Sequence, residues 1–288
     1  MVTINHTINH TKRKMEPGHR ALLKSAGGID MLSHYESMSE CADDFGANGA
    51  EDPNFEWAGG KKSACVRGMN GLSDQYVSAS DKLMDRIEPM LDLETSGRRV
   101  LPAMAGGAVN VPAHLSGSPL AMRMRRPDMS DRGEIHVFAS FLTSASVDKA
   151  LLEMRGAALL ALVRAIGITR PVRLTVFCMW SNRYWLSFDV ESSPLDLQRA
   201  AFALSSPTIL RQMGHGLLFY HAAPYASTAP SGADQINRVA RTLSDAQGVN
   251  PEHVVITPDL VSGDGLVAFQ DPETAARWVQ GQLTILGL

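Results

Sequence analysis

The 288-residue chain carries 27 basic and 30 acidic residues, which gives a formal net charge of −3, and 44% of its residues are hydrophobic. This composition is ordinary for a globular protein with one large or two small domains, and it is not that of a simple DNA-coating protein. No apolar run of about 18 residues occurs and the N-terminus lacks the apolar stretch of a secretory signal, so we expect an intracellular protein without a membrane span. Three isolated cysteines, Cys41, Cys65 and Cys178, argue against a disulfide framework and against a thiolate zinc site.

The first 96 residues predict a tail followed by an acidic helical region. Residues 1–28 contain the tetrapeptide TINH twice and a basic KRK cluster, a pattern typical of a flexible tail. Residues 29–96 have the apolar spacing of helices. Between Lys24 and Lys61 there is no basic residue, whereas eight acidic residues occur there: Asp30, Glu36, Glu40, Asp43, Asp44, Glu51, Asp52 and Glu56.

Residues 97–133 reverse the sign of the charge. Six arginines stand against two aspartates, a net of +4, and frequent Gly and Pro predict an extended loop or edge strand. In extended backbone Arg123 and Arg125 lie on one side, and Met122 and Met124 on the other. A chain with such segregated charge can present a basic surface to a polyanion, although both charged blocks are equally compatible with solvated surface.

From residue 134 the pattern alternates between strands and helices. This predicts, over residues 97–288, an α/β domain with a mostly parallel sheet flanked by helices, to which the N-terminal region is a helical addition. The strands starting at Val172 and Tyr184 are separated by the short turn SNR and predict one antiparallel hairpin. The other predicted strands are IHVFASF, HGLLFY and EHVVITP, and the predicted helices are DKALLEMRGAALLALVRAI, LDLQRAAFAL, GADQINRVARTLSDAQG and DPETAARWVQGQLTIL.

No motif for nucleotide binding, serine hydrolysis or zinc-dependent proteolysis occurs in the chain. We therefore expect no enzyme, no cofactor and no metal. His215 and His221, flanked by glycine and apolar residues, are more typical of core or surface positions than of metal ligands. An enzyme with dispersed catalytic residues stays an alternative, because Asp189, Glu191 and Asp259 lie near predicted strand ends.

The segment LTSAS, residues 142–146, follows the first strand of the α/β region. In von Willebrand factor A-like domains the corresponding strand ends in DxSxS, whose carboxylate and hydroxyls hold a divalent cation. Here Ser144 and Ser146 are present, but Leu142 replaces the aspartate and the main charged ligand is lost. The order of strand, polar loop, long helix and strand still resembles that fold. A metal-free von Willebrand A-like (Rossmannoid) protein-interaction module is therefore an alternative function.

The stretch FCMWSNRYWLSF places Trp180, Arg183, Tyr184 and Trp185 around the tip of the hairpin. Because Tyr184 and Trp185 are adjacent in a strand, they point to opposite sides, and the three rings cannot all face one core. An exposed ring beside an arginine is typical of a platform for single-stranded nucleic acid, on which each stacked base contributes about 1–3 kcal/mol. The alternative is an interface of a homo-oligomer, where Trp, Tyr and Arg are also enriched.

The run VNVPAHLSGSPLAMRMRRP, residues 109–127, followed by IHVFASFLTSASVD and MRGAALLALVRAI, resembles a bacteriophage domain with no assigned function. The shared pattern is N-V-P-A-x-L-x-G-x-P-x-x-M-R-x-R-x-P, then a strand and an R-G-A-A helix, and the resemblance covers residues 57–190. Among phage proteins, the chain also resembles the single-stranded-DNA-binding RNA polymerase cofactors of podoviruses that package a giant virion RNA polymerase.

This resemblance implies a non-enzymatic, largely sequence-independent single-stranded-DNA-binding cofactor that helps a phage RNA polymerase in the host cytoplasm, as a homo-oligomer. The acidic segment, residues 30–56, would contact the polymerase or cover the DNA-binding groove until DNA displaces it. The implied phosphate-contacting residues are Arg123, Arg125 and Arg126, extended by Arg98, Arg99, Lys61 and Lys62, and the implied stacking residues are Trp180, Arg183, Tyr184 and Trp185.

Overall fold

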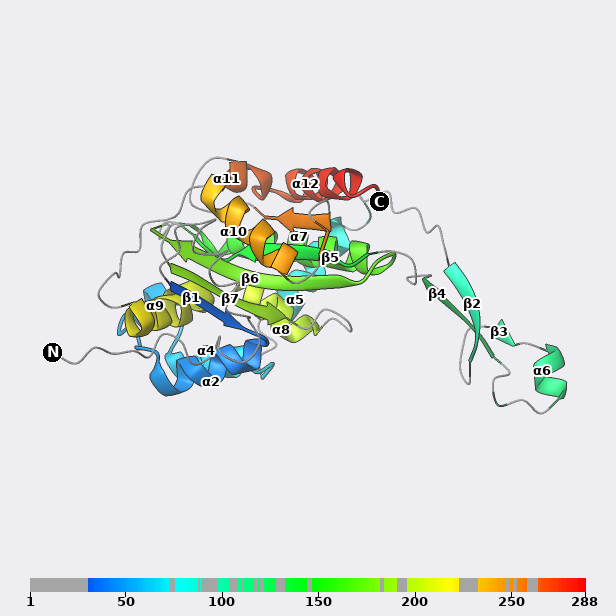
Figure 1. Cartoon of the computed structure of the whole chain (residues 1–288), viewed down its shortest axis with the longest axis horizontal. Helices are drawn as coiled ribbons and strands as arrows, with labels where there is room; N and C mark the ends of the chain where they lie inside the picture. Colours follow the sequence, from blue (N-terminus) through cyan, green and yellow to red (C-terminus); the bar gives the residue numbers. More distant parts are fainter. Residues whose placement is uncertain are drawn as a thin grey trace.

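Five strands form the main sheet, in the spatial order β1-β7-β6-β5-β8 (Figure 1). They are β1 (Met31–Tyr35), β5 (Ile135–Ser140), β6 (Val172–Trp180), β7 (Tyr184–Val190) and β8 (Val254–Ile256). β5 pairs in parallel with β6 and β8, and β1 with β7, while β6 and β7 run antiparallel. The predicted α/β class and the predicted hairpin are therefore confirmed. The computed structural model describes residues 31–72, 76–87, 89, 98–103, 108–109, 111–116, 119, 122–127, 133–143, 147–181, 184–190, 196–222, 233–246, 249–250, 253–257 and 264–288.

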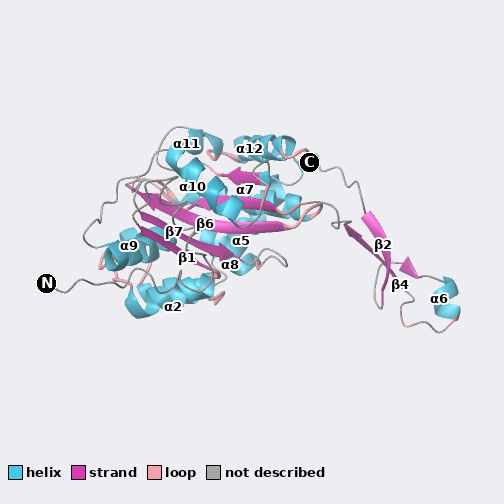
Figure 2. Ribbon diagram, in the orientation of Figure 1, coloured by secondary structure: helices cyan, strands magenta, loops and turns pink. Residues whose placement is uncertain are grey.

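Helices cover both faces of the main sheet (Figure 2). One face belongs to a large core shared with most of the helices, and the other to a small core under α10. No helix among the described residues is long and apolar enough to cross a membrane. The helices around this sheet are α2 (Met38–Asn48), α3 (Phe55–Ala58), α4 (Lys62–Met69), α5 (Val77–Ile87), α7 (Lys149–Gly167), α8 (Leu197–Ser205), the π-helix η3 (Ile209–Gly214), α9 (His215–Ala222), α10 (Ala233–Ala246), α11 (Asp264–Ala268) and α12 (Pro272–Ile285).

Local sequence signals explain where α7 and α12 begin. The Asp148 side chain accepts a hydrogen bond from the amide of Ala150 at the start of α7. At α12 the Asp271 carboxylate accepts from the amides of Glu273 and Thr274, and Pro272 takes the first helical position. Such caps satisfy amides that have no partner inside the helix.

α7 packs against the main sheet and α8 with almost its whole circumference buried. Gly156 permits this approach, because a Cβ atom at that position would collide with the Ser205 hydroxyl of α8. The continuous apolar pattern of α7 is thus that of a helix enclosed on most sides.

Two segments differ from their predicted secondary structure. Residues 29–96, predicted as helical, contain α2, α3, α4 and α5 but also β1, which extends the main sheet beside β7. The segment HGLLFY, predicted as a strand, lies in α9 and follows η3. A short apolar run does not by itself distinguish a strand from a buried helix, and this run continues a helix that starts before it.

Residues 97–133 contain a separate three-stranded antiparallel sheet, in the order β2-β4-β3, drawn to the right of the main sheet in Figure 1. Its strands are β2 (Arg98–Ala103), β3 (Ala108–Val109) and β4 (Met122–Pro127), and α6 (Val111–Leu115) lies between β3 and β4 in the chain. The expected extended conformation is thus realised as strand pairing, and the MRMRRP sequence forms the central strand. The predicted tail, residues 1–28, lies outside the described residues.

Candidate nucleic-acid interface

The three hairpin rings predicted to form an exposed stacking platform are buried. Trp180, Tyr184 and Trp185 are 1%, 3% and 0% exposed, so the expectation of exposed rings is wrong. Adjacent strand residues do point to opposite faces, but here helices cover both faces. Trp180 and Tyr184 stack on each other in the large core, and Trp185 stacks on Phe177 in the small core. Arg183 lies outside the described residues.

Hydrogen bonds also fix two of these rings from within. The Trp185 indole Nε1 donates to the Ser187 hydroxyl over 2.8 Å, and the Tyr184 hydroxyl donates to the Ser33 hydroxyl over 3.2 Å. Their polar atoms are therefore engaged inside the protein, as is usual for buried Tyr and Trp. In this fold they stabilise the sheet rather than present a face to a base.

The five predicted arginines of the 97–133 region occupy both faces of the small sheet. Residues directly opposite each other in an antiparallel pair share a face. β2 and β4 pair Arg99 with Arg126, which places these two positions on one face. Arg98, Arg123 and Arg125 occupy positions of the other face, in register with Pro127, Pro102 and Val100. By register, the positions of Arg123 and Arg125 belong to one face of the small sheet and the position of Arg126 belongs to the other.

A basic hollow lies at the start of α4, around the predicted residues Lys61 and Lys62. Its volume is about 640 Å³. Lys61 and Arg67 are exposed and Lys62 is half-buried, and no ion pair involves either exposed cation within the part of the chain that the structure describes. The hollow is lined by Gly46, Glu51, Lys61, Lys62, Ser63, Val66 and Arg67.

Two aromatic side chains that the sequence analysis did not select precede this hollow. Phe55 is 38% exposed, and the Lys61 ammonium lies 5.6 Å from the centre of its ring. Trp57 is half-buried and stacks on His215, with 5.8 Å between the ring centres. The signal was present as NFEWAGGKK, in which two rings stand a few residues before two lysines. The surrounding acidic residues obscured it.

The π-helix η3 holds the segment before α4, residues 52–61, which includes α3 and carries Phe55 and Lys61. The fully buried Gln212 accepts a hydrogen bond from the Asp52 amide and donates to the carbonyls of Asp52 and Gly60, over 2.8–3.1 Å. Two points of the loop are therefore fixed by one side chain. π-Helical turns are frequently found at functional sites.

Arg211 of η3 and His215, the first residue of α9, both contact Trp57. The Arg211 Nη1 donates to the Trp57 carbonyl over 2.8 Å, and its guanidinium lies 5.1 Å from the Trp57 ring centre. Burial lowers the pKa of His215, so its ring stacks on Trp57 in the neutral form at neutral pH. Gly59 ends α3 with φ of 82°, a left-handed conformation that favours glycine.

An internal carboxylate lies in the basic hollow. The Glu51 Oε1 accepts a hydrogen bond from the Lys62 amide over 2.9 Å, at the first helical residue of α4. The Lys62 ammonium donates to the Gly49 carbonyl over 2.6 Å and lies 5.2 Å from the centre of the Phe45 ring. Lys62 is thus partly committed to holding the end of α2, which leaves Lys61 and Arg67 as the cations most available to a ligand.

Arg155 of α7 contacts the carboxyl ends of β5 and β8. The buried Arg155 donates to the Ser140 carbonyl and, over 3.2 Å, to the Thr257 hydroxyl. Leu142, in place of the aspartate, is 3% exposed. No group of three metal-ligating side chains occurs within the described ranges, and Ser144, Ser146, Glu191 and Asp259 fall outside them. A fixed positive charge disfavours a divalent cation at this place.

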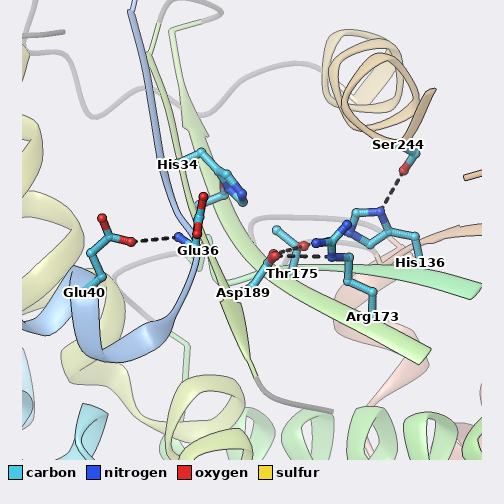
Figure 3. A network of polar contacts seen from close by, with 9 residues as sticks. His34, Glu36, Glu40, His136, Arg173, Thr175, Asp189 and Ser244 are labelled. Atoms are coloured by element: carbon cyan, nitrogen blue, oxygen red, sulfur yellow. Dashed lines mark hydrogen bonds and ion pairs between the residues drawn. The ribbon is translucent and has the colours of Figure 1, made fainter. Parts of the chain in front are cut away.

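A chain of polar side chains lies on the face of the main sheet that α10 covers (Figure 3). Thr175 donates to the Asp189 carboxylate over 2.5 Å, so its oxygen accepts from the His136 Nε2 at 2.7 Å. The His136 Nδ1 then accepts from the Ser244 hydroxyl of α10 over 3.0 Å. Asp189 also pairs with the Arg173 Nε at 3.3 Å.

The order of serine, histidine and aspartate in this polar chain is similar to that of a catalytic relay. Its serine and histidine, however, are not exposed to solvent. Ser244 and His136 are both 0% exposed, so no substrate reaches the serine in this conformation. Burial, with the charges of Arg173 and His34, lowers the pKa of His136 to about 3, which keeps the ring neutral. We therefore interpret the chain as the polar contact that fixes α10 on the sheet, and Asp189 as one of its structural members.

Comparison with known proteins gives one match. A family model described as a domain of unknown function (DUF7192) matches residues 17–243. No curated protein and no solved structure matches the chain. The matched stretch contains the basic hollow, the arginine-bearing sheet and the hairpin, while β8 and α12 follow it.

Proposed function

We propose that this chain, which belongs to the family of domains of unknown function DUF7192, binds single-stranded DNA with little sequence preference and assists a phage RNA polymerase. The observation that carries the DNA-binding part is the basic hollow with Lys61 and Arg67, beside the exposed ring of Phe55. Proteins that bind single strands combine cations along the backbone with rings on which bases stack. The phage and polymerase parts rest on the sequence resemblance at residues 57–190.

The size and charge of the hollow suit part of a nucleic-acid strand. Its volume of about 640 Å³ is within the range of small-ligand pockets, roughly 300–1,000 Å³. Three of its lining side chains are basic, although the chain as a whole has a net charge of −3. A local basic surface on an acidic protein attracts a polyanion at short range, and its attraction weakens with salt.

The small sheet provides a second basic surface for the same strand. Its region has a net charge of +4, and the β2–β4 pairing distributes five arginine positions over both faces. Contacts from arginine to phosphate carry no base information, so the resulting binding is tolerant of sequence.

Fluorescence-anisotropy titration of a labelled single strand of about 30 nucleotides, and of its duplex, tests this proposal. We expect salt-sensitive binding of the single strand by the full chain. In the double variant Lys61→Ala/Arg67→Ala, binding should weaken for all sequences alike, and the slope of log affinity against log salt should fall by about 1.4, since each lost phosphate contact releases about 0.7 of a counterion.

A charge-matched control separates the hollow from the overall charge. Lys82→Ala/Arg86→Ala removes two exposed cations from α5, away from the hollow, and should leave the slope near that of the unmodified chain. An equal loss of affinity and of salt slope in both double variants would assign the binding to the net charge of the chain. Absence of binding to either strand at low salt would overturn the proposal.

The connectivity of the main sheet favours a second candidate function, a metal-free von Willebrand A-like protein-interaction module. β5 lies between β6 and β8, α7 leads from β5 to β6, and the hairpin partner β7 runs antiparallel to β6. This order resembles that of von Willebrand A-like domains, and Arg155 contacts the carboxyl ends of β5 and β8. Under this function, purified phage RNA polymerase would bind the unmodified chain and the Lys61→Ala/Arg67→Ala variant equally well. Neither the labelled single strand nor its duplex would bind the chain.

A further inference from the structure

The carboxylate of Glu51 lies in the basic hollow, at the first amides of α4. Glu51 is the acidic residue among those that line the basic hollow, and its Oε1 faces the Lys62 amide at 2.9 Å. The first amides of a helix have no partner within it, and Lys61, the residue before α4, provides no side-chain cap. Glu51 therefore acts as the acceptor at this helix end, in a hollow that also contains three cations.

A phosphate oxygen offers the same chemistry as this carboxylate. Both are anionic acceptors that are favoured by amides at a helix start and by neighbouring cations. The two cannot share the hollow without repulsion, because like charges a few ångströms apart are unfavourable. Binding of a strand at Lys61 and Arg67 thus requires that Glu51 withdraws or that the strand binds less tightly.

The structure allows Glu51 to withdraw without rebuilding the loop. Its side chain is exposed and is held by a hydrogen bond to the Lys62 amide. The next residue, Asp52, is fixed through its amide and its carbonyl by the buried Gln212. The backbone that follows Glu51 is therefore clamped while the carboxylate can move into solvent.

We infer that Glu51 is an internal competitor that a phosphate of the bound single strand displaces from the basic hollow. This inference rests on the proposed DNA-binding function and names the regulation of the same surface. It gives the acidic segment a defined role: one of its carboxylates covers the basic residues until a polyanion with several phosphates replaces it.

The test is the substitution Glu51→Gln in the full chain, measured by anisotropy with the same labelled single strand at low salt. Glutamine keeps an oxygen acceptor for the Lys62 amide and removes the charge, so the fold is conserved and the competition is weakened. We expect the affinity for the single strand to rise about two- to fivefold, the effect of one charge at a helix end. Thermal unfolding of the variant checks that α4 stays folded.

Glu56→Gln is the matched control, because Glu56 is exposed, lies in the same acidic segment and does not line the hollow. A gain for Glu51→Gln with no gain for Glu56→Gln supports the inference. Equal gains in both variants overturn it in favour of net charge, and no gain in either, with binding by the unmodified chain, overturns it while the proposed function stands. No binding by any of the three proteins overturns the proposed function and the inference together.

Discussion

In the sequence, the hairpin tip and the segment before α4 both have aromatic residues within a few positions of basic residues, but their rings differ in exposure in the folded protein. In the hairpin, Trp180 and Trp185 are 1% and 0% exposed. In the loop, Phe55 is 38% exposed beside Lys61. The difference follows from the number of layers around each ring, because the hairpin strands have helices on both faces whereas the loop lies on the outside of η3. Exposure of a ring is thus decided by the tertiary layers and not by strand alternation.

The largest expected effect is the loss of stability when a ring is removed from the hairpin, compared with the loss when a ring is removed from the segment before α4. Trp185→Ala should lower the free energy of unfolding by about 3–5 kcal/mol, because it empties a fully buried position against Phe177 and α10. Phe55→Ala should lower it by less than about 1 kcal/mol, since its ring is partly in solvent. Urea unfolding followed by circular dichroism measures both. Similar losses in the two variants would contradict the comparison.

The next prediction concerns how the stability of the protein depends on pH through His136. This residue bonds to Thr175 of β6, which in turn bonds to Asp189 of β7. The pKa of His136 is about 3 in the folded protein and near 6.5 in an unfolded chain. The unfolded state therefore takes up the proton first, and the stability that depends on neutral His136 is present above pH 6.5 and is lost as the pH falls from about 6.5 towards 3.

His136→Gln tests this dependence, because an amide does not titrate. At pH 7.5 the variant should be less stable by about 1–3 kcal/mol, through the imperfect replacement of the bonds to Thr175 and Ser244. Urea unfolding at pH 7.5, 6 and 5 should show that the gap between the two proteins narrows as the pH falls. Parallel stability curves would assign the pH dependence to other groups.

The same comparison shows what the sequence could and could not predict. The strands IHVFASF, VRLTVFCMW and YWLSFDV and the SNR turn carry strong local patterns, and β5, β6 and β7 form as expected. β1 was missed because MLSHY, flanked by acidic residues, has no pattern that distinguishes a short edge strand. Its place beside β7 is decided by pairing across more than 150 residues of chain.

The candidate surface was predictable only in part, for a related reason. Lys61 and Lys62 were named within the phosphate-contacting set that the resemblance implies, and in the structure both line one hollow. Phe55 and Trp57 were not selected, because their exposure depends on η3, a π-helix in a segment predicted to lead into a strand. Gln212 carries no local signal for its role, since its contacts are to backbone atoms far away in the sequence.

The smallest expected effect concerns the hydrogen bonds that Gln212 makes to the segment before α4. Gln212→Ala removes three hydrogen bonds to the backbone of Asp52 and Gly60, groups that are half-buried and within reach of water, so the loss of stability should be about 1 kcal/mol. The loop before α4 then becomes less ordered, and the affinity for a single strand should fall about two- to fivefold through the added cost of ordering it. The salt dependence should not change, because no charge is removed.

Ser244→Ala is the control for Gln212→Ala, because it removes one buried hydrogen bond under α10, with an expected loss of stability that is also about 1 kcal/mol. If both variants lose similar stability and only Gln212→Ala loses affinity, the effect on binding comes from the loop and not from general destabilisation. Equal affinities for the two variants would place the single strand elsewhere on the molecule. The arginine positions of β2 and β4 would then be the surface to test, since they carry the other concentration of positive charge and belong to a separate sheet.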